Sequence, residues 1–250
     1  MRRIHPGASA VLKVGILLLP AIPALIWLWP AVSGTTLYYP AQVLAYLYVL
    51  AGSLLMGRRC LSWAELGLSR RGIGMGLTCG AVLIAERVLA QLALGLPLAL
   101  RPFDADRLAG ELVFILGLVG PVEELLFRGW LFQALDSWRG PGLAVLGSSL
   151  GFAIWHVGWA GSLMVIHLLL GLVLGLIRWR AGGIVGLIVV HGLFDLLAAE
   201  TLTPVSVTTL GQLTQITVIN RPAVLAGDLL LLALILYLWK VHPAISRPRP

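Results

Sequence analysis

The 250-residue chain alternates between long apolar runs and short clusters of charged residues and prolines. Most of the runs approach the length of about 20 residues that an α-helix needs to cross a bilayer, and they carry few charges. The pattern therefore predicts an all-α fold, a polytopic bundle of about eight transmembrane helices. The expected spans are residues 11–29, 37–56, 73–100, 111–134, 142–160, 161–179, 183–200 and 222–239.

The composition agrees with a membrane protein. Hydrophobic residues make up 59% of the chain and charged residues only 12%, whereas an ordinary soluble domain contains about 25% charged residues. We therefore expect a multi-pass integral protein of the cell membrane. The net charge of +7 indicates contact with anionic lipid, because no basic run is long enough to predict a nucleic-acid surface.

The distribution of basic residues gives a second view of the topology, since Lys and Arg accumulate on the cytoplasmic side of short membrane loops. With the N-terminus placed in the cytoplasm, most basic residues fall on that side. This asymmetry supports an even number of spans with both termini cytoplasmic. The residues expected inside are Arg2, Arg3, Arg58, Arg59, Arg70, Arg71, Arg139, Arg178, Arg180, Lys240, Arg247 and Arg249; those outside are Arg101, Arg107 and Arg221; Lys13, Arg87 and Arg128 lie within spans.

A single membrane domain over residues 1–250 is the simplest organisation, because no internal period of about 20 to 50 residues is visible. The motifs described below fall in a core of residues 73–200. Residues 58–72 break the hydrophobic pattern, and an amphipathic segment on the inner membrane surface and a plain cytoplasmic loop are both open for them. The first apolar run, 14–29, lacks a cleavage site for a signal peptidase, so we expect a retained span.

Ionisable and imidazole side chains inside expected spans are the strongest pointers to function. Such groups are costly in lipid and are therefore usually paired or functional. They are Glu86, Arg87, Glu123, Glu124, Arg128, His156, His167, His191, Asp195 and Asp228.

The stretch PVEELLFRGW, residues 121–130, holds two adjacent carboxylates and an arginine. Glu124 and Arg128 are four residues apart with the acid first, so the spacing predicts an ion pair within one helix. Glu123 is rotated by about 100° and cannot share that geometry. Two interpretations of Glu123 are open: a general base that reaches water, or a protonated side chain bonded to a backbone carbonyl.

Two further stretches carry imidazoles. FAIWH, residues 152–156, places His156 in the fifth expected span, and HGLFD, residues 191–195, places His191 and Asp195 one turn apart in the seventh. The spacing of four puts the last two side chains on one helix face. A single histidine in a span is more often a packing residue. Glu123, His156, His191 and Asp195 all fall near mid-depth, which is compatible with one shared cavity, but depth alone does not select these four, because His167, Glu86 and Asp228 fall there as well.

EELLFR, FAIWH and HGLFD resemble, in this order, the EExxxR, FxxxH and HxxxN/D motifs of the CPBP family, also called the Abi or type II CAAX endopeptidase family. This family contains membrane-embedded, glutamate-dependent proteases. The motifs cover residues 123–195 and lie in three different expected spans. The resemblance implies an intramembrane endopeptidase that hydrolyses a peptide bond of a membrane-anchored protein.

The resemblance also implies roles for the residues. Glu123 would activate a water molecule as general base, and His156 would help to hold that water. Glu124 and Arg128 would be the supporting pair.

His191, together with residue 195, would stabilise the oxyanion. Many relatives carry Asn at the second position, whereas this chain has Asp195. An ionised carboxylate cannot donate a hydrogen bond, so Asp195 either is protonated and donates or orients His191; we favour the second role.

Other interpretations remain open at this stage. We expect no cofactor, but carboxylates and imidazoles are also suitable ligands for Zn²⁺ in a metalloprotease variant. Buried Glu, His and Asp side chains also fit a proton-coupled transporter, and a non-catalytic immunity or scaffold relative would keep the same fold. The expected partners are the bilayer and a membrane-anchored or lipidated peptide, with prenylation undecided. His167, Glu86 and Asp228 match no family motif.

Overall fold

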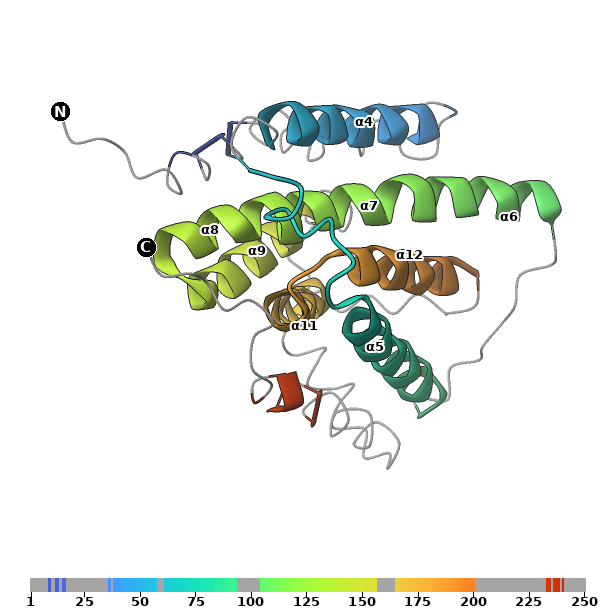
Figure 1. Ribbon diagram of the computed structural model, residues 1–250. Helices are drawn as coiled ribbons and strands as arrows, with labels where there is room; N and C mark the ends of the chain where they lie inside the picture. The colour runs from blue at the N-terminus through green and yellow to red at the C-terminus, as the bar shows by residue number, and fades with distance from the viewer. Residues whose placement is uncertain are drawn as a thin grey trace. The chain divides into compact units, whose positions relative to one another are not determined.

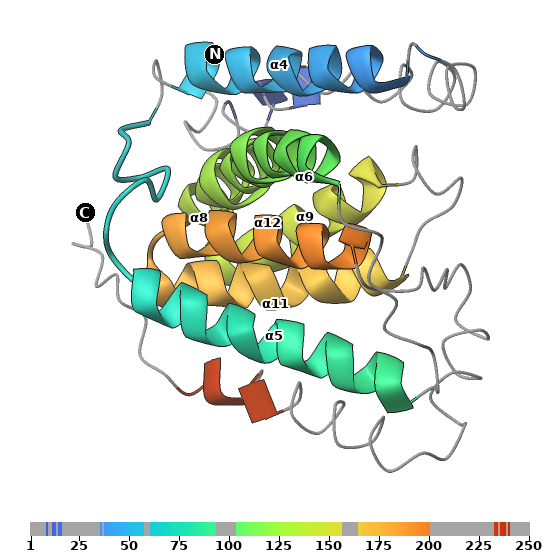
Figure 2. The same cartoon turned by 90° about the vertical axis from the view of Figure 1, so that its right-hand side faces the viewer.

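The computed structural model describes residues 9, 12–13, 15–16, 36, 38–57, 61–93, 104–156, 165–200, 233–234, 236–238 and 240 (Figures 1 and 2). The expected spans 11–29 and 222–239 lie almost entirely outside these residues. Residues 201–221, between the last two expected spans, and Asp228 also lie outside them.

The described elements are helices, and no strand occurs within the described ranges. The predicted all-α fold is therefore confirmed for this part of the chain. Among the described residues, no helix combines the length and the apolar character needed to cross a membrane, so the eight spans stay a prediction. The elements are α4 (Tyr38–Gly57), α5 (Ile73–Ala93), α6 (Ala105–Glu111), the π-helix η2 (Leu112–Val119), α7 (Gly120–Glu123), the π-helix η3 (Glu124–Leu131), α8 (Phe132–Arg139), α9 (Pro141–Trp155), α11 (Val165–Ala181) and α12 (Val185–Glu200).

The chain divides into two compact units. The first unit comprises Met1–Ser69 and Val122–Gly175, and the second comprises Arg70–Pro121 and Leu176–Pro250. The chain passes from one unit to the other between Ser69 and Arg70, within α7 and within α11.

In the first unit, α8 and α9 form a helical hairpin with a turn at Gly140. This residue has a φ of 89°, in the left-handed region that glycine adopts without a steric penalty. Pro141 follows at the start of α9, where its fixed φ suits a helix and its missing N–H costs nothing. The sequence RGPG therefore ends one helix and begins the next.

Small residues let α9 lie close to the helix that precedes it. A Cβ built on Gly147 would come within 2.6 Å of Leu135, and one on Gly151 within 3.0 Å of Leu131. One turn further along, the rings of Phe127 and Phe152 pack edge to face with centroids 5.5 Å apart. Because the two arms are antiparallel, the end of α9 is brought to the beginning of η3.

The first part of α11 also approaches α9 closely. A Cβ on Gly171 would lie 3.0 Å from the Cα of Ser149 and 3.1 Å from its Cβ. The Ser149 hydroxyl donates to the Val145 carbonyl at 2.6 Å, so this polar group is satisfied inside its own helix. The close contact places His167, one turn before Gly171, beside the end of α9.

In the second unit, α5 and α12 run side by side (Figure 2). They approach each other closely at Gly76 and Gly186, where an added Cβ on either residue would meet the other's Cα at 3.1 Å. On α7, Gly120 lies against the backbone of α12, with the Ile188 carbonyl 3.1 Å and the Gly192 nitrogen 3.3 Å from an added Cβ. Glycine therefore sets the helix spacing in this unit.

The helix that carries Glu123 is wider than an α-helix on both sides of α7. At the end of η2, the Gly120 N–H donates to the Ile115 carbonyl, five residues back, as in a π-helix. Pro121 gives a local reason, because it has no N–H for the Gly117 carbonyl and its ring would crowd that carbonyl in an α-helix. A wider turn before the proline relieves the conflict, so the helix continues to Glu123.

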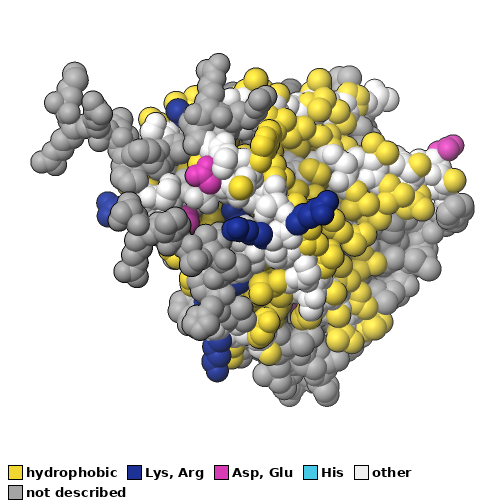
Figure 3. All heavy atoms as spheres, in the orientation of Figure 1, with side chains coloured by type: hydrophobic (Ala, Val, Ile, Leu, Met, Phe, Trp, Pro, Cys, Tyr) yellow, Lys and Arg dark blue, Asp and Glu magenta, His cyan; other side chains and the backbone are white. Residues whose placement is uncertain are grey.

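Large apolar side chains are exposed on several described helices, and Figure 3 shows many of them in yellow on one face. Within residues 58–72, positions 61–72 are described. Ser62 and Glu65 form a capping box there, because the Ser62 hydroxyl accepts from the Glu65 N–H and the Glu65 carboxylate accepts from the Ser62 N–H. Leu66 is buried and Trp63 is exposed. Both earlier interpretations of this segment stay open.

Candidate active site

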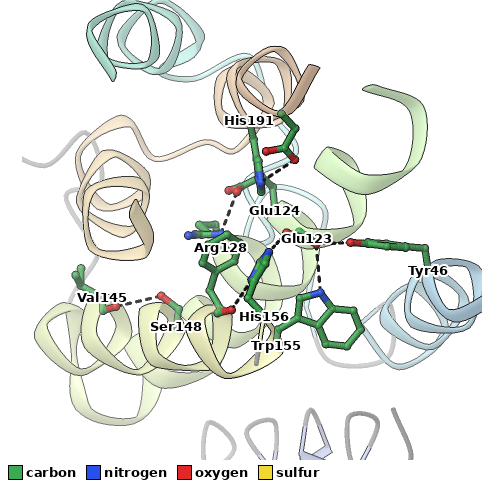
Figure 4. A network of polar contacts seen from close by, with 11 residues as sticks. Tyr46, Glu123, Glu124, Arg128, Val145, Ser148, Trp155, His156 and His191 are labelled. Carbon is green, nitrogen blue, oxygen red and sulfur yellow. Dashed lines mark hydrogen bonds and ion pairs between the residues drawn. The ribbon is translucent and has the colours of Figure 1, made fainter. Parts of the chain in front are cut away.

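The adjacent carboxylates Glu123 and Glu124 are both buried but meet different partners (Figure 4). Glu124 Oε1 accepts a hydrogen bond from Arg128 Nη1 at 3.0 Å, and both side chains are fully buried. The guanidinium carbon also lies 4.3 Å from the centroid of the Phe152 ring, within cation–π range. The ion pair predicted from the spacing of four residues is therefore present.

Glu123 Oε1 accepts hydrogen bonds from two neutral side chains. The Tyr46 hydroxyl of α4 donates at 2.5 Å, and Trp155 Nε1 of α9 donates at 3.2 Å. Tyr46 and Trp155 also contact each other edge to face, with ring centroids 6.2 Å apart. An indole N–H can only donate, so Oε1 serves as an acceptor and any proton on this carboxyl group sits on Oε2.

The other oxygen of Glu123 faces His156. The distance from Oε2 to His156 Nε2 is 3.9 Å, beyond the range of a direct hydrogen bond. The opposite ring nitrogen, Nδ1, lies 2.8 Å from the Phe152 carbonyl, and because a carbonyl only accepts, Nδ1 carries a proton. In the neutral ring, Nε2 is then an acceptor whose lone pair points toward Glu123. We call Tyr46, Glu123, Trp155 and His156 the Glu123 cluster.

His167 lies beside the Glu123 cluster. The sequence motifs do not predict this position. Its ring stacks on His156 with centroids 4.0 Å apart and an angle of 15° between the planes. It also contacts Phe152, at 6.1 Å between centroids. Because two charged imidazoles stacked this closely would repel each other, the stack favours at most one protonated ring. The helix pairing at Gly171 is the structural reason for the contact.

Tyr46 and Trp155 are also missed by the motif analysis. Tyr46 precedes Glu123 by 77 positions and lies in an apolar helix with no polar pattern. Trp155 is adjacent to His156 in the FAIWH motif, but the motif does not assign it a role. The sequence gives only an indirect indication of these two residues, because a phenol and an indole in apolar segments need hydrogen-bond partners.

In the second unit, α12 carries His191 and Asp195 on one face, as the spacing predicts. His191 Nε2 lies 3.5 Å from Asp195 Oδ2. The His191 side chain is 3% exposed, whereas that of Asp195 is 32% exposed, so the carboxylate reaches the outside of its unit and the imidazole does not. His191 lies between Ile188 and Gly192, the two α12 residues whose backbone meets Gly120.

The remaining candidates are less informative. Glu86 lies on α5 and is partly exposed, while the side chain of Arg87 lies outside the described residues, as does Asp228. Within the described part of the chain, His, Cys, Asp and Glu side chains form no group of three or more suited to hold a metal ion.

Comparison with known proteins gives one match. Residues 106–197 match a family model described as type II CAAX prenyl endopeptidase Rce1-like. No curated protein and no solved structure matches the chain significantly. The matched stretch contains all three motifs, so the family resemblance predicted from them is confirmed.

Proposed function

We propose that this chain, which carries an Rce1-like domain of the type II CAAX prenyl endopeptidases over residues 106–197, is an intramembrane endopeptidase that uses a glutamate-activated water. The observation that carries the proposal is the arrangement around Glu123. One oxygen is held by two donors, and the other faces the imidazole of His156 at 3.9 Å. This is the arrangement expected of a general base and a group that together hold one water.

The reaction follows from the hydrogen-bonding capacity of these atoms. A water beside the line between Glu123 Oε2 and His156 Nε2 donates one hydrogen to each, which leaves an oxygen lone pair for the scissile carbonyl. Oε2 takes the first proton as the C–O bond forms and the carbonyl oxygen becomes an oxyanion. The same proton then passes to the leaving nitrogen as the C–N bond breaks, which restores the carboxylate.

We assign the oxyanion to His191. When both its ring nitrogens are protonated, the imidazole has two donors. The Asp195 carboxylate lies 3.5 Å from Nε2, and we assign Nδ1 as the donor to the developing charge. Asp195 thus orients the ring and does not itself face the oxyanion.

We further propose a membrane-anchored protein substrate, of the prenylated CAAX type that the family description suggests, and no metal in the reaction. That description names an endopeptidase, which favours hydrolysis over the transporter and scaffold alternatives. Cleavage of a farnesylated peptide, compared with the same peptide lacking the lipid, tests the substrate class. Metal analysis and cleavage in the presence of a chelator test the direct glutamate mechanism.

The central experiment is Glu123→Gln. Gln keeps the size of the side chain but cannot take the water proton, so we expect cleavage to fall by about 10²-fold to 10⁴-fold while the protein stays folded. Proteomic comparison of membrane fractions from cells with wild-type and variant protein then identifies the substrate. Glu65→Gln is the matched control, because a glutamine preserves the capping box. A folded Glu123→Gln variant with wild-type cleavage would contradict the proposal.

A further inference from the structure

We propose that Tyr46 is a positioning residue of this site: with Trp155 it holds Glu123 Oε1, so that only Oε2 faces the reacting water. The inference rests on the proposed function. It adds to the site a residue of α4, which precedes the stretch matched by the family model.

The first argument is the chemistry of the contact. The Tyr46 hydroxyl donates to Glu123 Oε1, and a hydroxyl bonds more strongly to a charged oxygen than to a neutral one. Trp155 shares the same acceptor. Two donors on Oε1 fix the plane of the carboxylate. Rotation of the carboxylate out of this plane would break both hydrogen bonds. A base whose orientation is fixed needs no reorganisation when the water arrives.

The second argument is that the donors are themselves held. Tyr46 is 3% exposed, as is Trp155, and their rings contact at an angle of 77°. Trp155 also packs against Phe127, at 6.4 Å between ring centroids. The tyrosine ring is therefore fixed by aromatic packing, and its hydroxyl by the hydrogen bond to Glu123.

Tyr46→Phe tests the proposal, because it removes the hydroxyl and keeps the ring. We expect kcat for peptide cleavage to fall about 10-fold to 100-fold, the range for loss of a hydrogen bond to a charged group, with KM changed less than about twofold. The matched control is Tyr48→Phe, the same change at an exposed residue of the same helix. It should retain wild-type kcat.

A second readout does not depend on cleavage. In protein with ¹³C-labelled glutamate, infrared difference spectra against Glu123→Gln identify the Glu123 carboxylate band. We expect Tyr46→Phe to shift this band and Tyr48→Phe to leave it in place. An unshifted band in folded Tyr46→Phe overturns the contact, whether or not the protein cleaves peptides.

The two readouts separate this inference from the proposed function. If Glu123→Gln still cleaves, the proposed function fails while the infrared result decides the contact. If Tyr46→Phe has wild-type kcat, or loses activity through KM alone, the positioning role is overturned even with a shifted band. Should Tyr46→Phe fail to fold, Trp155→Phe removes the second donor of Oε1 and must lower kcat and shift the same band.

Discussion

Glu124 and Glu123 are adjacent buried carboxylates, but Glu124 is paired with a cation and Glu123 is hydrogen-bonded to neutral side chains. Glu124 meets a cation inside its own helix, so the two charges cancel and neither is available. Glu123 meets a phenol, an indole and an imidazole from other segments. Neutral donors stabilise a carboxylate without cancelling its charge, so the carboxylate can still accept a proton. Glu124 therefore has a structural role, whereas Glu123 can act as a base.

The largest expected effect breaks the ion pair. Arg128→Met leaves Glu124 buried without its cation, and we expect the free energy of unfolding to fall by about 3–5 kcal/mol. Thermal unfolding in detergent measures it. The double variant Glu124→Leu with Arg128→Met removes both charges and should recover part of the loss.

The stability of Glu123→Gln is the comparison for this test. Glu123→Gln should unfold close to the wild-type temperature, since Gln can still accept from Tyr46 and Trp155 through its carbonyl. Equal destabilisation by Glu123→Gln and Arg128→Met would contradict the different roles that we assign to Glu123 and Glu124.

A smaller effect is expected at the imidazole stack. His167→Leu removes the flat partner of His156, and we expect kcat to fall about 3-fold to 10-fold, as for loss of one aromatic contact. His167→Phe keeps a ring and should stay near wild type. Steady-state kinetics of both variants measure the effect; an equal loss in both would assign the role to a nitrogen of His167 and not to stacking.

The smallest effect is expected at Asp195. Asn at this position can still accept from His191 through its carbonyl, so Asp195→Asn should change kcat by no more than about threefold. Asp195→Leu, which removes every acceptor, should lower kcat further. A loss above about 100-fold in Asp195→Asn, measured by the same kinetics, would mean that the negative charge itself is needed.

Contacts within one helix could be predicted from the sequence, and contacts between segments could not. The spacing of four predicts both Glu124 with Arg128 and His191 with Asp195, because helix geometry alone fixes such neighbours. The partners of Glu123 depend on how separate helices pack. Tyr46 lies 77 positions away, and no periodicity records that distance.

The helix type was also beyond prediction. Hydropathy predicts one continuous helix over residues 111–134, and helical structure is present there. The apolar pattern does not distinguish bonds to the fourth residue from bonds to the fifth, so η2 and η3 were not foreseen. Pro121 is the local signal for the first of them. His167 shows the same limit, since its stack on His156 depends on the approach of Gly171 to Ser149.

The turn at Gly140 has a consequence for the order of assembly. Glu123 lies on the helix that continues through η3 into α8, and His156 follows the last residue of α9, so their contact closes only the chain between them. Short closures have a low entropy cost and form quickly, and elements made early fold before later ones emerge. We therefore expect Glu123 and His156 to be in place during synthesis, before α12 has been translated.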